Sequence, residues 1–266
     1  MTKGKAHLFD FDFTIADSID EIVDLLINDL SIEQKVRYAT LITPNAFQIV
    51  QYNKKENKYL KDFYRNSPII LPDGAPIVWL SKILKKENQI KHRLPGSDLF
   101  PVLWNKIKQE HITTTLVLTN ESIASNFTNE YMLCNCLVPK IFSVDDTLYM
   151  KEFATMVAEK IINTNSKFLF LGISYPKQEI LGIHICNILK EKGYKSKVWI
   201  LLLGASFEFY FGMKKRAPSI VQKYGFEWLY RFIMEPQRLW KRYTIDNIIF
   251  IYLSIIEVFK KRNKIY

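Results

Sequence analysis

The chain has 266 residues, of which 48% are hydrophobic and 14% aromatic, and its formal net charge at pH 7 is +10. This length and composition exclude a disordered or low-complexity protein and allow one large domain with or without an appendage, while three cysteines make no convincing disulfide or metal framework. The start of the chain lacks the apolar core of a secretory signal and the apolar run 248–256 is too short to cross a bilayer, so we expect a cytoplasmic protein.

The first predicted element lies in LFDFDFTIADS, residues 8–18, where a strand over 6–13 carries two carboxylates, Asp10 and Asp12. Side chains alternate along a strand, so both carboxylates would lie on one side. This arrangement resembles the nucleophile signature of Mg²⁺-dependent, haloacid-dehalogenase-type phosphatases, although Phe13 stands where that signature usually has glycine. The alternative is a strand that leads into the acidic N-terminus of an amphipathic helix over 18–30.

Strand-like and helix-like patterns alternate from there to residue 204. We expect strands at 38–43, 69–70, 113–119, 167–173 and 197–204, and helices near 99–109, 151–163 and 177–192. Strands that alternate with helices predict a Rossmann-like α/β fold, in which a mostly parallel sheet is covered by helices on both faces. In such a fold the ligand crevice lies beyond the carboxyl ends of the strands.

The pattern changes at about residue 215, where aromatic and basic helices begin. We therefore divide the chain into an α/β body, 1–214, and a basic helical appendage, 215–266, that would contact a membrane and close the active site. From residue 214 onward, twelve Lys or Arg stand against four acidic residues, a net charge of +8. This charge favours an anionic partner, and the interleaved aliphatic and aromatic residues favour a lipid surface over nucleic acid.

Polar residues follow two of the predicted strands. Thr43 and Asn45 stand where the strand 38–43 meets a helix, and Asp73 stands in a Pro-Asp-Gly turn before the next helix. A carboxylate at a strand end is well placed to act as a general base. Asp is also a favoured helix cap, and for this stretch alone the cap is the simpler interpretation.

Two further stretches carry cationic residues suited to phosphate. Arg93 precedes a Gly-Ser-Asp turn, where it could bind phosphate through two N–H groups or pair with a surface acid. Lys177 and Gln178 follow Pro176 in the first turn of a predicted helix, and a helix N-terminus with a lysine suits a diphosphate. Proline at this position is also ordinary at the start of a helix.

These stretches together resemble a known family. TPN (43–45), PDG (72–74), RLPGSD (93–98), PKQE (176–179), GASFEFYFGMKKRAP (204–218) and GFEWLYRFIMEPQRLWKRY (225–243) follow one another as in the WecG/TagA/CpsF family of bacterial glycosyltransferases, glycosyltransferase family 26. The resemblance covers about residues 5–245, and its last block is the most specific. LFDFDFTIADS then corresponds to the first strand and helix start of the family, with Asp10 and Asp12 outside the chemistry.

The resemblance implies an inverting transfer of an N-acetylmannosamine-like sugar from a UDP-sugar to N-acetylglucosamine on undecaprenyl diphosphate, in the synthesis of a surface polysaccharide or teichoic acid. By similarity, Asp73 would be the general base, and Thr43 and Asn45 would position the acceptor sugar or the transition state. The substrate-binding residues would come from both parts of the chain and are Arg93, Lys177, Gln178, Gly204, Glu208, Arg231, Arg238 and Arg242. No metal or other cofactor is expected, because cationic side chains and helix N-termini would stabilise the leaving diphosphate.

Some features depart from the family. Asn120 and Glu121 stand where the family usually has a pair of glycines, and 121–150 matches it poorly, so the donor sugar and donor site stay open. Two alternatives to the transferase remain, the phosphatase that uses Asp10 and Asp12, and a non-enzymatic basic membrane-binding module or inactive relative. We expect the protein at the inner face of the cell membrane, bound peripherally, with no nucleic-acid partner. The sequence does not indicate the oligomeric state.

Overall fold

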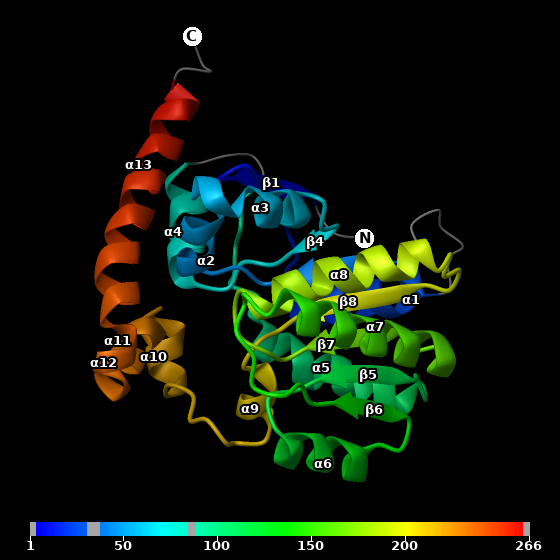
Figure 1. Cartoon of the computed structure of the whole chain (residues 1–266). Coiled ribbons are helices and arrows are strands. Elements are labelled where there is room, and N and C mark those ends of the chain that lie inside the picture. The colour runs from blue at the N-terminus through cyan, green and yellow to red at the C-terminus, as the bar shows by residue number, and fades with distance from the viewer. Residues whose placement is uncertain (1–3, 31–37, 85–88, 263–266) are drawn as a thin grey trace.

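The computed structural model describes residues 4–30, 38–84 and 89–262, and its centre is a parallel β-sheet (Figure 1). Six strands lie in the order β4-β3-β8-β7-β5-β6. They are β3 (Tyr38–Ile42), β4 (Ile69–Ile70), β5 (Thr114–Val117), β6 (Cys134–Leu137), β7 (Phe168–Leu171) and β8 (Val198–Leu202). The predicted α/β fold with a mostly parallel sheet is therefore confirmed, and β6 is a strand that the sequence analysis missed.

Alternate side chains of the central strands enter two separate cores, one on each face of the sheet. Leu169 and Leu171 of β7 belong to one core, and Phe168 and Phe170 belong to the other. The first core is covered by α2 (Ala46–Tyr52), α3 (Lys58–Arg65), α4 (Ala75–Ile83), α7 (Thr147–Thr164) and α8 (Lys177–Glu191). The second is covered by α1 (Ile19–Asp29), α5 (Gly96–Gln109), α6 (Glu121–Glu130) and α9 (Ser206–Tyr210). Burial of strands on both faces explains why their sequences are continuously apolar.

The stretch 6–13 forms a hairpin, so the prediction of one continuous strand is wrong. β1 (Lys5–Leu8) pairs antiparallel with β2 (Phe11–Thr14), and the turn between them consists of Phe9 and Asp10, both with positive φ. The Asp10 carboxylate lies 3.0 Å from Lys61 Nζ of α3. Asp12 lies on β2, where it pairs with His7 of β1 at 2.8 Å. The two carboxylates are thus outside the six-stranded sheet, and the geometry expected of a phosphatase nucleophile is not formed.

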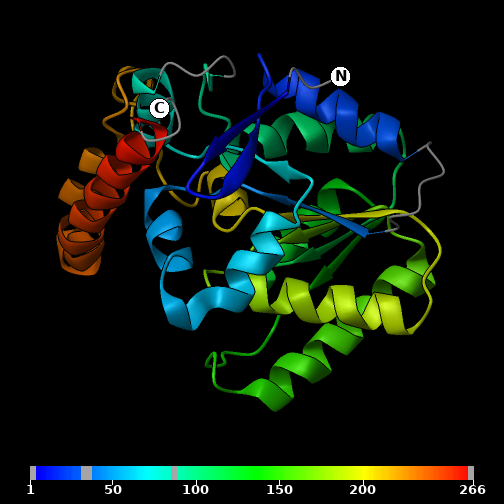
Figure 2. The same ribbon diagram turned by 90° about the horizontal axis from the view of Figure 1, so that it is seen from above.

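The C-terminal helices pack along one side of the α/β body. Figure 1 shows α13 (Asn247–Arg262) upright beside α2 and α4, with α10 (Ser219–Lys223), α11 (Glu227–Met234) and α12 (Pro236–Lys241) at its lower end, and Figure 2 shows these C-terminal helices on the same side of the body from above. A short π-helical turn, η2 (Arg242–Asp246), joins α12 to α13. The stretch 248–256 lies in α13, and none of the helices among the described residues is long and apolar enough to cross a membrane.

Contacts from several parts of the chain hold these helices against the body. Arg216 pairs with Asp98 of α5 at 2.6 Å, and Gln51 of α2 donates a hydrogen bond to Asp246 at 3.2 Å. Phe250 of α13 is buried, and its ring centroid lies 5.4 Å from that of Phe9 in the hairpin turn. The appendage and the body therefore share one packed interface.

Candidate active site

The parallel strands end at one edge of the sheet, and the loops that follow them build the site. Leu71 donates to the carbonyl of Ile42, and Asp73 donates to the carbonyl of Pro44 at 3.1 Å, so the loops after β3 and β4 are joined. These backbone bonds bring the Thr-Pro-Asn and Pro-Asp-Gly stretches together, as the topology of a parallel α/β sheet requires.

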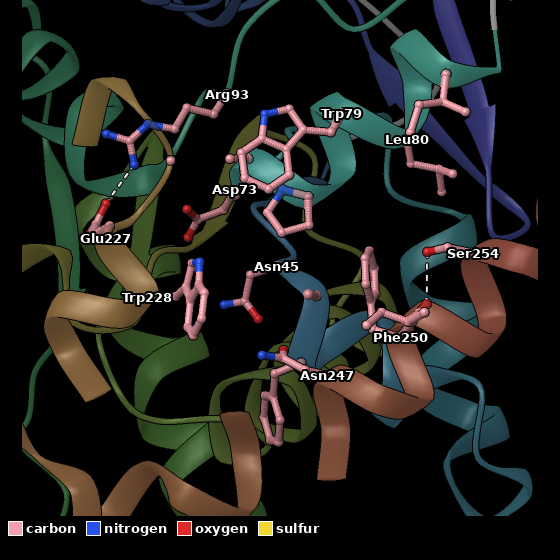
Figure 3. Close-up of a pocket in the computed structure, with 18 of the residues that line it drawn as sticks. Asn45, Asp73, Trp79, Leu80, Arg93, Glu227, Trp228, Asn247, Phe250 and Ser254 are labelled. Carbon is pink, nitrogen blue, oxygen red and sulfur yellow. Dashed lines mark hydrogen bonds and ion pairs between the residues drawn. The ribbon is translucent and has the colours of Figure 1, made fainter. Parts of the chain in front are cut away.

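Asp73 does not cap the helix that follows it. Gly74 occupies the N-cap position of α4 with φ of +142°, a conformation open to glycine and strained for other residues. The cap interpretation of Asp73 is therefore wrong. Its carboxylate is only partly buried, and Figure 3 shows it projecting into the same open space as the side chain of Asn45.

Asn45 is held by a capping box at the start of α2. Its side-chain oxygen accepts from the backbone N–H of Gln48 at 3.3 Å, and the backbone N–H of Asn45 donates to the side-chain oxygen of Gln48 at 3.1 Å. Since the amide oxygen faces the helix, the two N–H groups of the Asn45 side chain can donate to a ligand. The capping box thus fixes the orientation of a potential hydrogen-bond donor beside Asp73.

Glu227 joins two of the predicted arginines. Arg93 donates to Glu227 at 2.6 Å and to the side chain of Gln222 at 2.7 Å, and Arg231 donates to the second oxygen of Glu227 at 2.5 Å. Burial works to raise the pKa of Glu227, but Arg231, Arg93 and Arg216 outweigh it and hold the pKa below its usual value. Glu227 is therefore ionised at neutral pH and holds α11 against the body.

A cavity of about 590 Å³ between the body and the appendage is lined by Asn45, Asp73, Arg93, Glu227 and Arg231 (Figure 3). Its polar end contains Asp73, Asn45, Arg93 and Arg231, with the indole of Trp228 beside them. Its other end is apolar and lies between α4 and α13. The apolar lining includes Trp79, Leu80, Ile83, Phe250, Ile251, Ile255 and Val258. The cavity therefore suits a molecule with a polar, anionic part and a long apolar part.

Three other predicted residues of the body do not line this cavity. Gln178 is buried in the first turn of α8, and its side-chain oxygen accepts from the backbone N–H of Gly204 at 3.1 Å. Thr43 is buried at the end of β3, against Gly96. Lys177 donates to the carbonyl of Phe142.

The rest of the predicted set lies in or near the appendage. Glu208 of α9 pairs with Lys214. The side chains of Arg238 and Arg242 lie outside the part of the chain that the structure describes. No group of three or more His, Cys, Asp or Glu side chains suited to a metal ion occurs among the described residues.

Several lining residues were given no role by the sequence analysis. Glu227 could have been identified as the partner of Arg231, because acid and base four residues apart on a helix are neighbours. Its bond to Arg93, 134 residues away, leaves no such signal in the sequence. The same holds for Asn247 and Phe250, which reach the cavity only because α13 packs beside α2.

Comparison with known proteins gives one consistent result. Residues 7–264 match the model of the glycosyl transferase WecG/TagA/CpsF family. An N-acetylglucosaminyldiphosphoundecaprenol N-acetyl-beta-D-mannosaminyltransferase of Bacillus subtilis (strain 168) is 31% identical over 215 residues, which are 79% of this chain and 77% of the relative. Proteins of the same name from Staphylococcus aureus (strain MW2) and Bacillus spizizenii are both 28% identical, over 85% and 77% of this chain and 81% and 74% of the relatives.

Proposed function

The chain belongs to the WecG/TagA/CpsF family of glycosyltransferases, and we propose that it transfers N-acetylmannosamine from a UDP donor to N-acetylglucosamine on undecaprenyl diphosphate. The relatives named above support this donor sugar and this acceptor. The observation that carries the proposal is the cavity, in which a carboxylate, an amide and two arginines at one end meet an apolar wall at the other. A sugar linked through a diphosphate to a polyprenol likewise combines a polar, anionic part with a long apolar part.

Asp73 is proposed as the general base. The acceptor hydroxyl oxygen attacks the anomeric carbon of the donor sugar, Asp73 takes the hydroxyl proton, and the bond to UDP breaks with its electron pair on the leaving phosphate. Attack from the side opposite to UDP inverts the anomeric centre. Asn45 supports this role, because its side-chain N–H groups can hold a sugar oxygen beside the Asp73 carboxylate.

The arginines are proposed to bind the acceptor diphosphate. Arg231 donates to Glu227, lines the cavity and has a side chain that is 41% exposed, so its guanidinium is within reach of a phosphate bound there. Arg93 also pairs with the carboxylate of Glu227 and lines the same cavity. We propose that cationic side chains of this kind, and not a metal ion, balance the charge of the diphosphates, as the family resemblance implies.

The apolar end is proposed to hold the first isoprene units of the acceptor and to face a membrane. The exposed large apolar side chains of this region include Trp79, Ile83, Tyr224, Phe226, Ile233, Trp240, Ile251, Tyr252, Ile255 and Phe259. Together with a net charge of +8 over 214–266, they fit the interface of an anionic bilayer, where each basic residue contributes about 1 kcal/mol. This supports a peripheral position on the membrane that carries the acceptor.

The direct test is acceptor-dependent release of UDP. Wild type and Asp73→Asn would be given UDP-N-acetylmannosamine and a lipid-diphosphate N-acetylglucosamine, with and without EDTA. We expect turnover that needs the acceptor, survives EDTA and falls at least a thousandfold in the variant, since the amide cannot accept the proton. Turnover with another UDP-sugar alone would refute the donor, and turnover that EDTA abolishes would refute metal independence.

Membrane association needs a separate measurement. Cosedimentation with vesicles that contain anionic lipid should exceed that with neutral vesicles and should weaken as salt is added. Equal binding to both vesicle types would refute the electrostatic part of the proposal without affecting the assignment of the reaction.

A further inference from the structure

A buried carboxyl group lies in the helix that follows β7 and has no part in the reaction described above. Glu179, in the first turn of α8, has 0% exposure. One of its oxygens accepts from the Tyr64 hydroxyl at 2.5 Å and from the side-chain nitrogen of Gln178 at 3.0 Å. The other oxygen has no hydrogen-bond partner of ordinary geometry among the described residues. Burial of a carboxyl group costs free energy, and buried hydrogen-bond networks of this kind fix the positions of the side chains that they join.

The side chain of Gln178 is held at both ends. Its nitrogen donates to Glu179, and its oxygen accepts from the backbone N–H of Gly204 at the end of β8. An amide can rotate by half a turn and exchange its oxygen and nitrogen, but the backbone N–H of Gly204 can only donate, so the oxygen of Gln178 faces Gly204 and the nitrogen faces Glu179. One N–H of the Gln178 side chain is thereby used, and the second is left in a fixed place at the sheet edge.

The same carboxyl group also lies beside the capping box of α2. The side chain of Gln48 is close enough to Glu179 to influence its pKa, and the oxygen of that side chain accepts from the backbone N–H of Asn45. Glu179 therefore stands between Gln178 on α8 and, through Gln48, Asn45 on α2. These are two of the residues that the family resemblance assigns to the site.

We propose that Glu179 is a positioning residue for sugar transfer, which fixes the amide of Gln178 so that its remaining N–H donates to a substrate oxygen. The inference rests on the proposed function and adds a residue that does not itself touch the substrate. Because Glu179 acts through Gln178, its replacement changes substrate binding only where Gln178 is present.

The acceptor oxygen of Glu179 decides which variant preserves this role. Burial raises the pKa of Glu179, against the hydrogen bonds from Tyr64 and Gln178, which lower it. The side chains that face it, Tyr64, Gln178 and Gln48, are uncharged. The other titratable groups near it are Tyr52 of α2, Tyr59 of α3 and Tyr175 before α8. Glutamine at this place has the same shape and keeps an acceptor oxygen for Tyr64 and Gln178. Glu179→Gln therefore keeps the function, and Glu179→Leu removes the acceptor.

The kinetic test compares Glu179→Gln, Glu179→Leu and Leu181→Ala, a buried position on the same helix, for kcat/KM of the UDP-sugar. We expect kcat/KM to fall at least tenfold in Glu179→Leu and less than threefold in the other two variants. Leu181→Ala serves as the control for destabilisation, because it removes a buried side chain from the same helix and should lower Tm as Glu179→Leu does. In a Gln178→Ala background, Glu179→Leu should add less than twofold. Equal losses for Glu179→Leu and Leu181→Ala, or losses that multiply in the double variant, would overturn the proposal.

A second readout does not need turnover. The side-chain NH₂ signals of Gln178 in an ¹⁵N–¹H spectrum can be assigned by their loss in Gln178→Ala. We expect these signals to shift and to exchange faster with water in Glu179→Leu, and to stay in place in Glu179→Gln. Unchanged signals in Glu179→Leu would overturn the positioning role. An inactive wild type with the expected signal changes would instead overturn the proposed function alone.

Discussion

Replacing Gly225 by alanine should open the cavity, because a side chain at this position has no room beside α4. A Cβ atom on Gly225 would lie 2.6 Å from the Cβ of Ala75 and 2.7 Å from the indole ring of Trp79. The indole can rotate, but the Cβ of Ala75 is fixed to the helix. The segment before α11 would have to move about 0.8 Å away from α4 to reach 3.4 Å, where ordinary contact begins.

The substitution has two energetic costs, the steric contact with α4 and the positive φ of the backbone. A control substitution at Gly212 separates the two. Overpacking of this kind costs about 1–3 kcal/mol, and alanine at the φ of +79° found for Gly225 costs about 1–2 kcal/mol more. Gly212 has a φ of +67°, and a Cβ atom added there would have no other atom within 4 Å, so Gly212→Ala carries the backbone cost alone. The contact with α4 should therefore lower the ratio of closed to open protein about 5- to 150-fold beyond the control.

The assay is kcat/KM for acceptor-dependent UDP release, together with hydrogen–deuterium exchange over 219–234. Gly225→Ala should lose activity at least fivefold more than Gly212→Ala and should exchange faster in α10 and α11. The melting temperature of the α/β body should change little in either variant. Equal activity in the two variants, within twofold, would refute the reasoning that packing against α4 closes the cavity.

Further predictions concern a charge, a glycine and the hairpin. Glu227→Gln should weaken docking of α11 by about 1–3 kcal/mol, seen as faster exchange at pH 7. In wild type, the lowered pKa of Glu227 means that docking is complete above the unfolded pKa near 4.5 and is lost as pH falls through the folded value; docking that persists at pH 3 would contradict this. Gly172→Ala would place a Cβ 2.5 Å from Phe207 and should lower Tm by about 2–12 °C, whereas Gly182→Ala, in the interior of α8 with contacts of 3.4 Å or more, should not lower Tm; similar losses of Tm in both would contradict this. Asp10→Asn should keep the rate of UDP release within twofold of wild type, because Asp10 takes no part in the reaction. A large loss of rate would contradict this.

The sequence predicted the sheet well because its strands are buried on both faces. Continuous apolar runs such as 167–173 and 197–204 mark β7 and β8 without help from the rest of the chain. β6 was missed because an edge strand with the sequence Cys-Asn-Cys-Leu has neither a long apolar run nor strict alternation. The hairpin was missed because its turn, Phe9-Asp10, lacks the glycine or asparagine that normally marks positive φ.

The candidate site was predictable only in part, for a similar reason. Asp73 and Asn45 follow strands that are neighbours in a parallel sheet, so topology brings them together. The bonds of Glu227 to Arg93 and of Glu179 to Tyr64 join residues more than 100 positions apart, and they depend on how helices pack across the edge of the sheet. Glu179 was read as part of a motif, and its complete burial could not be inferred from a helix start rich in polar residues.

The contact between Phe9 and Phe250 links the closing of the cavity to the timing of protein synthesis. All six strands of the central sheet are translated between Phe9 and Phe250, whose ring centroids end 5.4 Å apart. At about 5–20 residues per second, the ribosome reaches Phe250 roughly 12–50 s after Phe9. During that interval the hairpin turn, with its strained φ of +54°, lacks the ring that covers it, and the cavity lacks its α13 wall. A nascent chain can thus complete its sheet while its lipid-facing side is still open, and a product truncated before α13 would expose this apolar surface to chaperones.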